Sequence, residues 1–339
     1  MPSSAVRTFT DPDAYFRGIR NLQIDGLVVQ GGEFGAKLTR IDLHRLFMCG
    51  FEESLPRVMK VTPSARRVGI LFSTDPDQPT MLTNGMEISQ GQIAEVGLHS
   101  EWYLRSSSAC RWGTMSLAPG DLATAGETIT GCELVAPIFA RSVTPPPPAL
   151  SRLRKLHAAA RHLAKTVPDV LAKPEVAQAM EQNLVEAMAF CLAESHSDDV
   201  RNVWRRRTIL MQRLEEALQA NSEGPLYISQ LCAATGVSYP TLRGCCQEYL
   251  GMGPKRYLLL RRMHLARRAL RRADSKKTTV TEVATDYGFW GFGRFSVFYR
   301  SVFGESPSAT LLRPPEDTSR VNSGHLWNLS NPDSHPRFD

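Results

Sequence analysis

The spacing of hydrophobic and polar residues changes along the chain, and each spacing predicts a different kind of element. Between about residues 20 and 142 the apolar residues form short β-branched runs such as 68–72 and 93–98, bounded by Gly, Pro, Asp and Asn. Such runs predict strands, and Asn84-Gly85 and Pro119-Gly120-Asp121 predict tight turns between them. Several short strands at this spacing predict a β sandwich or a small barrel.

The spacing becomes helical after a run of four prolines, Pro145 to Pro148. Because proline cannot continue a helix or a central strand, this run predicts a stiff extended spacer that ends the β region. Residues 149–194 then predict two amphipathic helices, the second beginning at Pro174. Their apolar positions are Leu153, Leu156 and Ala160, then Val176, Met180, Leu184 and Ala187. Two interpretations stay open: this pair is a dimer interface, or it packs against the β region.

Residues 228–310 contain one pattern twice. Gly236, Gly251 and Pro254 return 52 or 53 residues later as Gly288, Gly304 and Pro307. Each copy predicts a short helix, a turn at a glycine that tolerates positive φ, and a second helix. In a helix-turn-helix of this kind the second helix enters the major groove of DNA.

The apolar positions in each copy define an inner face. In the first copy these positions are Leu231, Ala234, Leu242 and Cys246, and Ser238 is expected to cap the second helix. In the second copy Thr279 and Glu282 match a capping box. Its inner positions are Val283, Ala284, Tyr287, Phe295, Phe298 and Tyr299, with the second helix expected from Trp290 to Arg300.

The outward positions are the expected DNA contacts. They are Ser238, Tyr239, Pro240, Thr241, Arg243 and Gln247 in the first copy, and Gly291, Phe292, Gly293, Arg294, Val297 and Arg300 in the second. Arg243 can hold guanine O6 and N7 in a bidentate pair, and Arg300 is placed nearer a phosphate. Between the copies, residues 255–272 predict a basic helix that joins the two readers rigidly and adds phosphate affinity.

Charge is distributed unevenly, in agreement with this division. Residues 1–200 carry 19 Lys/Arg and 22 Asp/Glu, a net charge of −3, whereas residues 201–313 carry 19 and 8, a net charge of +11. Only the second part is therefore expected to bind a polyanion. The seven cysteines show no CxxC spacing, so we expect reduced thiols, no metal and no cofactor. Without an apolar signal region or an 18-residue apolar run, a soluble cytoplasmic protein is expected.

The C-terminal pattern resembles the AraC/XylS family of bacterial transcription regulators. The matching residues are Leu231, Gly236-Val-Ser238, Leu242, Gly251, Pro254, Tyr257-Leu258, Arg262-Met263, Ala266, Leu270, Val283-Ala284, Gly288-Phe289, Phe295-Ser296, Phe303-Gly304, Pro307 and Ser308, over about 85 residues. The resemblance implies two helix-turn-helices that bind promoter DNA, with a variable N-terminal domain that senses an effector or dimerises. Departures occur at Gly244, Cys245-Cys246, Val297 and Ala309-Thr310, so the base sequence that is read does not follow from the family.

The expected fold is multidomain α+β, with a β-rich, cupin-like sensor domain at 1–144 and a proline linker with a helical dimerisation region at 145–200. A double helix-turn-helix domain at 205–313 and a disordered tail at 314–339 follow. Double-stranded promoter DNA, a small-molecule effector, a second copy of the chain and RNA polymerase are the partners expected. The effector site is not assigned. Glycine-rich residues 30–35 predict a turn, and His44 and His99, expected in strands, lack a partner at metal spacing.

Two other functions remain as alternatives. The first is a DNA-tethered enzyme that transfers an alkyl group to a cysteine, for which Cys49, Cys110 and Cys132 are the N-terminal candidates. None of the three has the Pro-Cys-His context of such a nucleophile. The second is a nucleoid protein that binds DNA without sequence preference through the same basic surface. Neither alternative is favoured over the regulator, for which no catalytic residue is expected.

Overall fold

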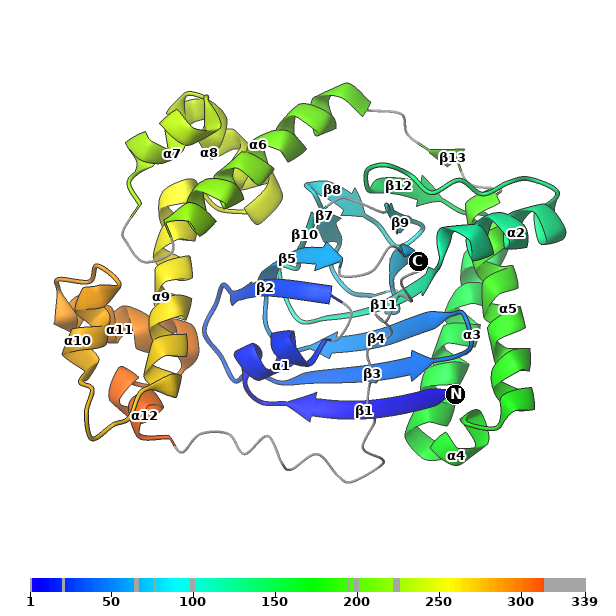
Figure 1. Cartoon of the computed structure of the whole chain (residues 1–339), viewed down its shortest axis with the longest axis horizontal. Coiled ribbons are helices and arrows are strands. Elements are labelled where there is room, and N and C mark those ends of the chain that lie inside the picture. Colours follow the sequence, from blue (N-terminus) through cyan, green and yellow to red (C-terminus); the bar gives the residue numbers. More distant parts are fainter. Residues whose placement is uncertain are drawn as a thin grey trace, which may run out of the picture.

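The structure is a computed structural model that describes residues 2–19, 22–63, 67–75, 77–97, 101–193, 196–197, 201–221 and 226–313. Within them a β-rich part lies between a layer of helices on one side and the C-terminal helices on the other (Figure 1). This arrangement confirms the predicted α+β class with a β-rich N-terminal part and a helical C-terminal part. The tail predicted to be disordered, 314–339, and His99 lie outside the described residues.

The β-rich part consists of two antiparallel sheets. The larger sheet has the order β1 (Ser3–Phe9), β3 (Ala36–Asp42), β4 (Phe47–Glu53), β11 (Cys110–Leu117), β6 (Val68–Ser73), β9 (Ile93–Val96), β12 (Arg141–Thr144) and β13 (His196–Ser197). The smaller sheet has the order β2 (Leu22–Val28), β5 (Arg57–Pro63), β10 (Trp102–Arg105), β7 (Met81–Thr83) and β8 (Met86–Ile88). The β7–β8 hairpin turns at Asn84 and Gly85, both at positive φ, as their sequence predicted.

Aromatic residues and one buried carboxylate lie in the core between the two sheets. Phe51 stacks on Trp112 with ring centroids 3.7 Å apart. Glu53 accepts hydrogen bonds from the Tyr15 hydroxyl of α1 (Pro12–Gly18) at 2.5 Å and from Arg57 Nε at 2.8 Å. Because this carboxylate is fully paired, its burial in an apolar core does not leave an isolated charge.

A helical layer covers the outer face of the larger sheet (Figure 1). It contains α2 (Pro119–Thr130), α3 (Pro147–Thr166), α4 (Pro168–Leu171) and α5 (Pro174–Ala193). On α3, Leu153 and Ala160 are buried as predicted, and His157 Nε2 lies 3.0 Å from the carbonyl of Cys49 in β4. The inner face of this helical pair therefore packs against the β region, the second of the two interpretations.

Two proline predictions were wrong for one physical reason. Pro147 and Pro148 lie in the first turn of α3, so the extended spacer is shorter than the four prolines. Likewise, Pro119 starts α2 where a tight turn was predicted. In the first turn of a helix the N–H that proline lacks has no intrahelical partner, so proline is tolerated there. His44, expected in a strand, lies in the turn between β3 and β4.

The C-terminal part is helical throughout its described residues. Its elements are α6 (Arg201–Ala220), α7 (Ile228–Thr235), α8 (Tyr239–Leu250), α9 (Pro254–Arg272), α10 (Val280–Asp286), α11 (Phe292–Phe303) and α12 (Pro307–Leu312). Leu231, Leu242 and Tyr249 form one core with Tyr103 and Val58 of the smaller sheet. The β-rich part and the first helix-turn-helix thus share a continuous hydrophobic core.

Candidate nucleic-acid interface

Each helix-turn-helix changes direction at a glycine in the left-handed region. Gly236 follows α7 with φ +71°, and Gly288 follows α10 with φ +73°. A Cβ is disfavoured at these angles, whereas glycine adopts them without steric cost. The repeated glycines of the sequence therefore mark the two turns, as predicted.

The first unit, α7 and α8, packs through the predicted stripe with one shift. Leu231, Leu242 and Cys246 are buried. Ala234 is exposed and Thr235 is buried in its place, with its hydroxyl donating to the Leu231 carbonyl at 2.7 Å. The prediction for Ala234 was wrong because a helix of eight residues gives too few positions to fix the phase of its inner face.

The outward face of α8 carries the residues expected to contact DNA. Ser238, Tyr239, Pro240, Thr241, Arg243 and Gln247 are all exposed. Ser238 occupies the N-cap position, but its hydroxyl lies 3.1 Å from the Thr241 hydroxyl and does not cap a backbone N–H as predicted. Gln247 Nε2 donates to the Gly251 carbonyl at 3.1 Å, at the far end of the helix. The polar side chains that are most available to a ligand therefore lie in the first two turns of α8.

The second unit, α10 and α11, has the predicted capping box. Glu282 Oε2 accepts from Thr279 N at 2.7 Å, and Glu282 N donates to Thr279 Oγ1 at 3.2 Å. Phe295 and Tyr299 are buried, whereas Phe298 and Tyr287 are only half-buried. Helix α11 begins at Phe292, two residues later than predicted, with Gly291 at the N-cap position and no side-chain cap.

The predicted contacts on α11 also face outward. Phe292, Gly293, Arg294, Val297 and Arg300 are exposed, and Gly291 is half-buried. The Arg294 side chain folds back toward the start of the helix. Its Nε lies 3.2 Å from the position that a Cβ on Gly291 would occupy. The exposed face therefore combines two cations with apolar side chains.

The arginines of the two reading helices differ in their contacts from two arginines of α9. Arg243, Arg294 and Arg300, on α8 and α11, form no side-chain hydrogen bond or ion pair with any described residue. By contrast, Arg267 and Arg268 of α9 are ion-paired with carboxylates of the β-rich part. The first group therefore has unsatisfied donors that a polyanion could occupy.

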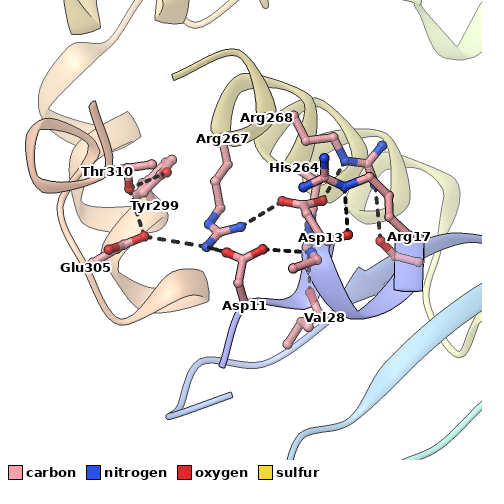
Figure 2. Close-up of polar contacts among 12 residues, drawn as sticks. Asp11, Asp13, Arg17, Val28, His264, Arg267, Arg268, Tyr299, Glu305 and Thr310 are labelled. Carbon is pink, nitrogen blue, oxygen red and sulfur yellow. Dashed lines mark hydrogen bonds and ion pairs between the residues drawn. The ribbon is translucent and has the colours of Figure 1, made fainter. Parts of the chain in front are cut away.

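Figure 2 shows how α9 is attached to the β-rich part. Arg267 donates to Asp11 and, at 2.7 Å, to Asp13, and also lies 3.7 Å from Glu305 of the loop before α12. Arg268 donates to Asp13 at 2.8 Å and to Asp25 of β2 at 3.1 Å. Glu305 in turn accepts from Thr310, whose hydroxyl accepts from Tyr299 on α11.

Burial and charge shape the protonation states in this cluster. Burial alone would raise the pKa of Asp11, but Arg267, the hydrogen bond from the Ala14 N–H and Arg271 together outweigh it and hold that pKa below its usual value. Burial lowers the pKa of His264 on α9 to about 4. His264 is therefore neutral at pH 7, and its Nε2, 3.0 Å from the carbonyl of Val28, carries the proton that this contact requires.

A second attachment is centred on Glu215 of α6. Its Oε1 accepts from the hydroxyls of Tyr103 on β10, at 2.9 Å, and of Tyr257 on α9, at 2.8 Å. Arg261 on α9 lies 3.4 Å from the other oxygen and 3.1 Å from Asp25. The carboxylate thus links one strand of the β-rich part to two helices of the C-terminal part.

These contacts correct, for three residues, the prediction that the basic residues of α9 supply phosphate affinity. For the exposed Lys255, Arg256 and Arg272 it stays a prediction. Arg261, Arg267 and Arg268 are used within the chain, so they are not free for DNA. Sequence reasoning missed them because their partners Asp13 and Asp25 lie more than 230 residues earlier. One signal was available: Arg261, His264 and Arg268 recur at helical spacing on one face, although polar residues at such positions usually face solvent.

Comparison with known proteins agrees with this geometry. A family described as "Helix-turn-helix domain" matches residues 231–313. The chain is 41% identical over 98 residues to the probable thc operon regulatory protein of Rhodococcus erythropolis, covering 29% of this chain and 30% of that protein. It is 31% identical over 113 residues to the XylDLEGF operon transcriptional activator 1 of Pseudomonas putida, covering 33% and 34%. The chain spans about a third of the length of these curated relatives.

Solved structures give similar matches. A probable AraC family transcriptional regulator from Rhodopseudomonas palustris is 35% identical over 30% of this chain and 94% of that one, with a TM-score of 0.28. The AraC-like transcriptional activator CuxR is 13% identical over 78% of this chain and 95% of that one, with a TM-score of 0.37.

The repeated unit and its glycine turns define a double helix-turn-helix domain. The sequence matches show that this C-terminal part is similar to the corresponding regions of those transcription regulators. Across the described ranges, no helix is long and apolar enough to cross a bilayer. No group of three His, Cys, Asp or Glu side chains placed to hold a metal occurs among the same residues.

Proposed function

We propose that the chain is a sequence-specific DNA-binding regulator of transcription that reads promoter DNA with α8 and α11. The observation that carries this proposal is the division of the arginines. Those of the two reading helices are exposed and unpaired, whereas three of α9 are paired within the chain. Exposed guanidinium groups at the start of a recognition helix suit base edges and phosphates.

The spacing of the two readers supports simultaneous binding. Helix α9 has 19 residues and therefore spans about 28 Å at 1.5 Å per residue. Successive major grooves on one side of the duplex lie about 34–36 Å apart. A rigid helix of this length suits two reading helices that address neighbouring turns of the same groove.

The β-rich part is proposed to be the sensor. It shares a core with the first helix-turn-helix and is ion-paired to α9, so a change in it would reach the DNA-reading helices. A small-molecule effector, a second copy of the chain and RNA polymerase are its proposed partners. A dimer through residues 149–194 would use the outer faces of α3 and α5, because their inner faces are occupied.

Among the alternatives, the enzyme that transfers an alkyl group to cysteine receives little support. Cys49 and Cys110 are buried, and burial raises the pKa of each thiol to about 12. Since the thiolate is the nucleophile, neither suits alkyl transfer at neutral pH. Cys132 is exposed, so it is the cysteine with which to test this alternative.

Genome-wide footprinting of the full-length chain tests the proposal. We expect a small number of sharp sites that a chain with both Arg243→Ala and Arg294→Ala does not occupy. Repeating the experiment with extracts from cells grown on different media would identify an effector by sites that strengthen. Diffuse binding along the whole genome would contradict the proposal and favour a nucleoid protein.

A further inference from the structure

The second helix-turn-helix exposes apolar side chains that its own core does not need. Trp290, Phe292 and Val297 are 76%, 41% and 73% exposed. The inner face of α11 is supplied by Phe295, Tyr299 and Val302, which are buried. Val297 therefore contributes little packing within the chain, and as a β-branched residue it is also a modest helix former.

Val297 lies in the middle of the surface expected to face the groove. It follows Gly293 by four residues and precedes Arg300 by three, so the three positions share one face of α11. Gly293 has no side chain, and no neighbouring atom lies within 4 Å of where its Cβ would be, so nothing projects above the helix backbone at this position. A low face allows the backbone to approach the base edges closely enough for a short side chain to touch them.

The two reading helices differ in the chemistry they offer. Helix α8 presents Thr241 and Arg243, whose side chains carry groups that can hydrogen-bond to a base edge. At the centre of α11, Val297 has neither a donor nor an acceptor. Among the base edges in the major groove, the C5-methyl group of thymine is the one apolar partner. The unpaired Arg294 and Arg300 on the same helix favour a polyanion as the occupant of this surface over an apolar protein face.

We propose that Val297 is a specificity-determining residue that selects thymine, through its C5-methyl group, in the half of the DNA site read by α11. This inference rests on the proposed function, since it names the base chemistry that one of the two readers recognises. The first reader selects by hydrogen bonds, and the second selects by an apolar contact flanked by cations. A site read in this way has two halves of different base preference.

The test begins by selecting tight-binding duplexes from random DNA with the full-length chain. Each thymine of the selected site is then replaced singly by uracil, which removes only the methyl group, and Kd is measured for each duplex. We expect one thymine in the half read by α11 to lose about fourfold in affinity, the effect of about one buried methyl-sized group. The Val297→Ala variant should bind the unmodified site more weakly by a similar factor. For this variant, replacing that one thymine by uracil should cause no further loss of affinity.

Leu312→Ala is the matched control, because Leu312 is 72% exposed in the same domain but lies at the end of α12. It should keep both the affinity and the dependence on the methyl group. Two outcomes would overturn the role of Val297 and leave the proposed function intact. In the first, affinity for the selected site depends on no thymine methyl group, and in the second, that dependence persists in Val297→Ala. A selection that enriches no sequence overturns the proposed function together with the role of Val297.

Discussion

Arg267 Nη1, on the helix that joins the two helix-turn-helix units, lies 2.7 Å from a carboxylate oxygen of Asp13 in the first helix of the chain. The side chain of Arg267 is only 4% exposed, and that of Asp13 is 10% exposed. A buried ion pair thus joins two segments that lie 254 residues apart in the sequence. Because Arg267 also contacts Glu305, the same guanidinium connects the β-rich part to the second reading unit (Figure 2).

Removal of Arg267 should destabilise the full chain strongly. In Arg267→Ala, the buried carboxylates of Asp11 and Asp13 lose their main partner, and breaking a buried pair from one side costs about 3–5 kcal/mol. Thermal unfolding at pH 7 measures the effect. Arg272→Ala, which removes an exposed arginine at the end of the same helix, should change stability by less than about 0.5 kcal/mol.

A triple variant separates charge burial from loss of packing. Arg267→Met together with Asp11→Asn and Asp13→Asn leaves no isolated charge, so it should recover much of the stability that Arg267→Ala loses. If Arg267→Ala unfolds like the unaltered chain, the ion pair does not attach the β-rich part to α9.

Two buried histidines should make stability fall in mild acid. Burial lowers the pKa of His157 and His264 to about 4, whereas an unfolded histidine titrates near 6.5. Between these values the unfolded chain binds more protons, so acid favours unfolding. The loss begins as the pH falls below about 6.5 and is complete near 4. From pH 7 to pH 5 each histidine should contribute about 2 kcal/mol of this loss.

His264→Gln and His157→Gln test this effect separately. A glutamine amide can still donate to the carbonyl of Val28 or Cys49, but it does not titrate. Each variant should therefore lose less stability between pH 7 and pH 5 than the unaltered chain, as measured by urea unfolding at both pH values. An equal loss in all three chains would contradict the assignment of the pH dependence to these residues.

Two glycine replacements should change stability in opposite directions. Gly236 has φ +71° at the first turn, so Gly236→Ala should cost about 1–2 kcal/mol. Gly244 lies inside α8, where an added Cβ would meet nothing within 4 Å. Gly244→Ala should therefore stabilise the helix by up to about 1 kcal/mol. Urea unfolding of the two variants checks both signs, and a stabilised Gly236→Ala would contradict the turn geometry.

Features set by near neighbours in the sequence were predictable, and those set by distant segments were not. The glycine turns and the Thr279–Glu282 capping box depend on residues a few positions apart, so the sequence specifies them directly. The outward faces of α8 and α11 follow from helical spacing in the same way. The pairing of Arg267 with Asp13 joins residues 254 positions apart, and only the folded chain brings them together. The start of α3 at Pro147 obeys the same local rule as the start of α5 at Pro174, since proline is tolerated in the first turn of a helix.

The exposed arginines of the two reading helices should contribute to specificity. If Arg243 and Arg294 contact base edges, Arg243→Ala and Arg294→Ala should each weaken binding to the selected site by about 1–3 kcal/mol, with little effect on random DNA. Kd measured for both DNAs over a series of salt concentrations checks this. If a variant weakens binding to both DNAs alike and reduces the salt slope by about one, that arginine contacts a phosphate. Arg272→Ala, outside the reading helices, is the control and should preserve the ratio of specific to nonspecific affinity, because its position at the end of α9 reaches no base edge in the proposed arrangement.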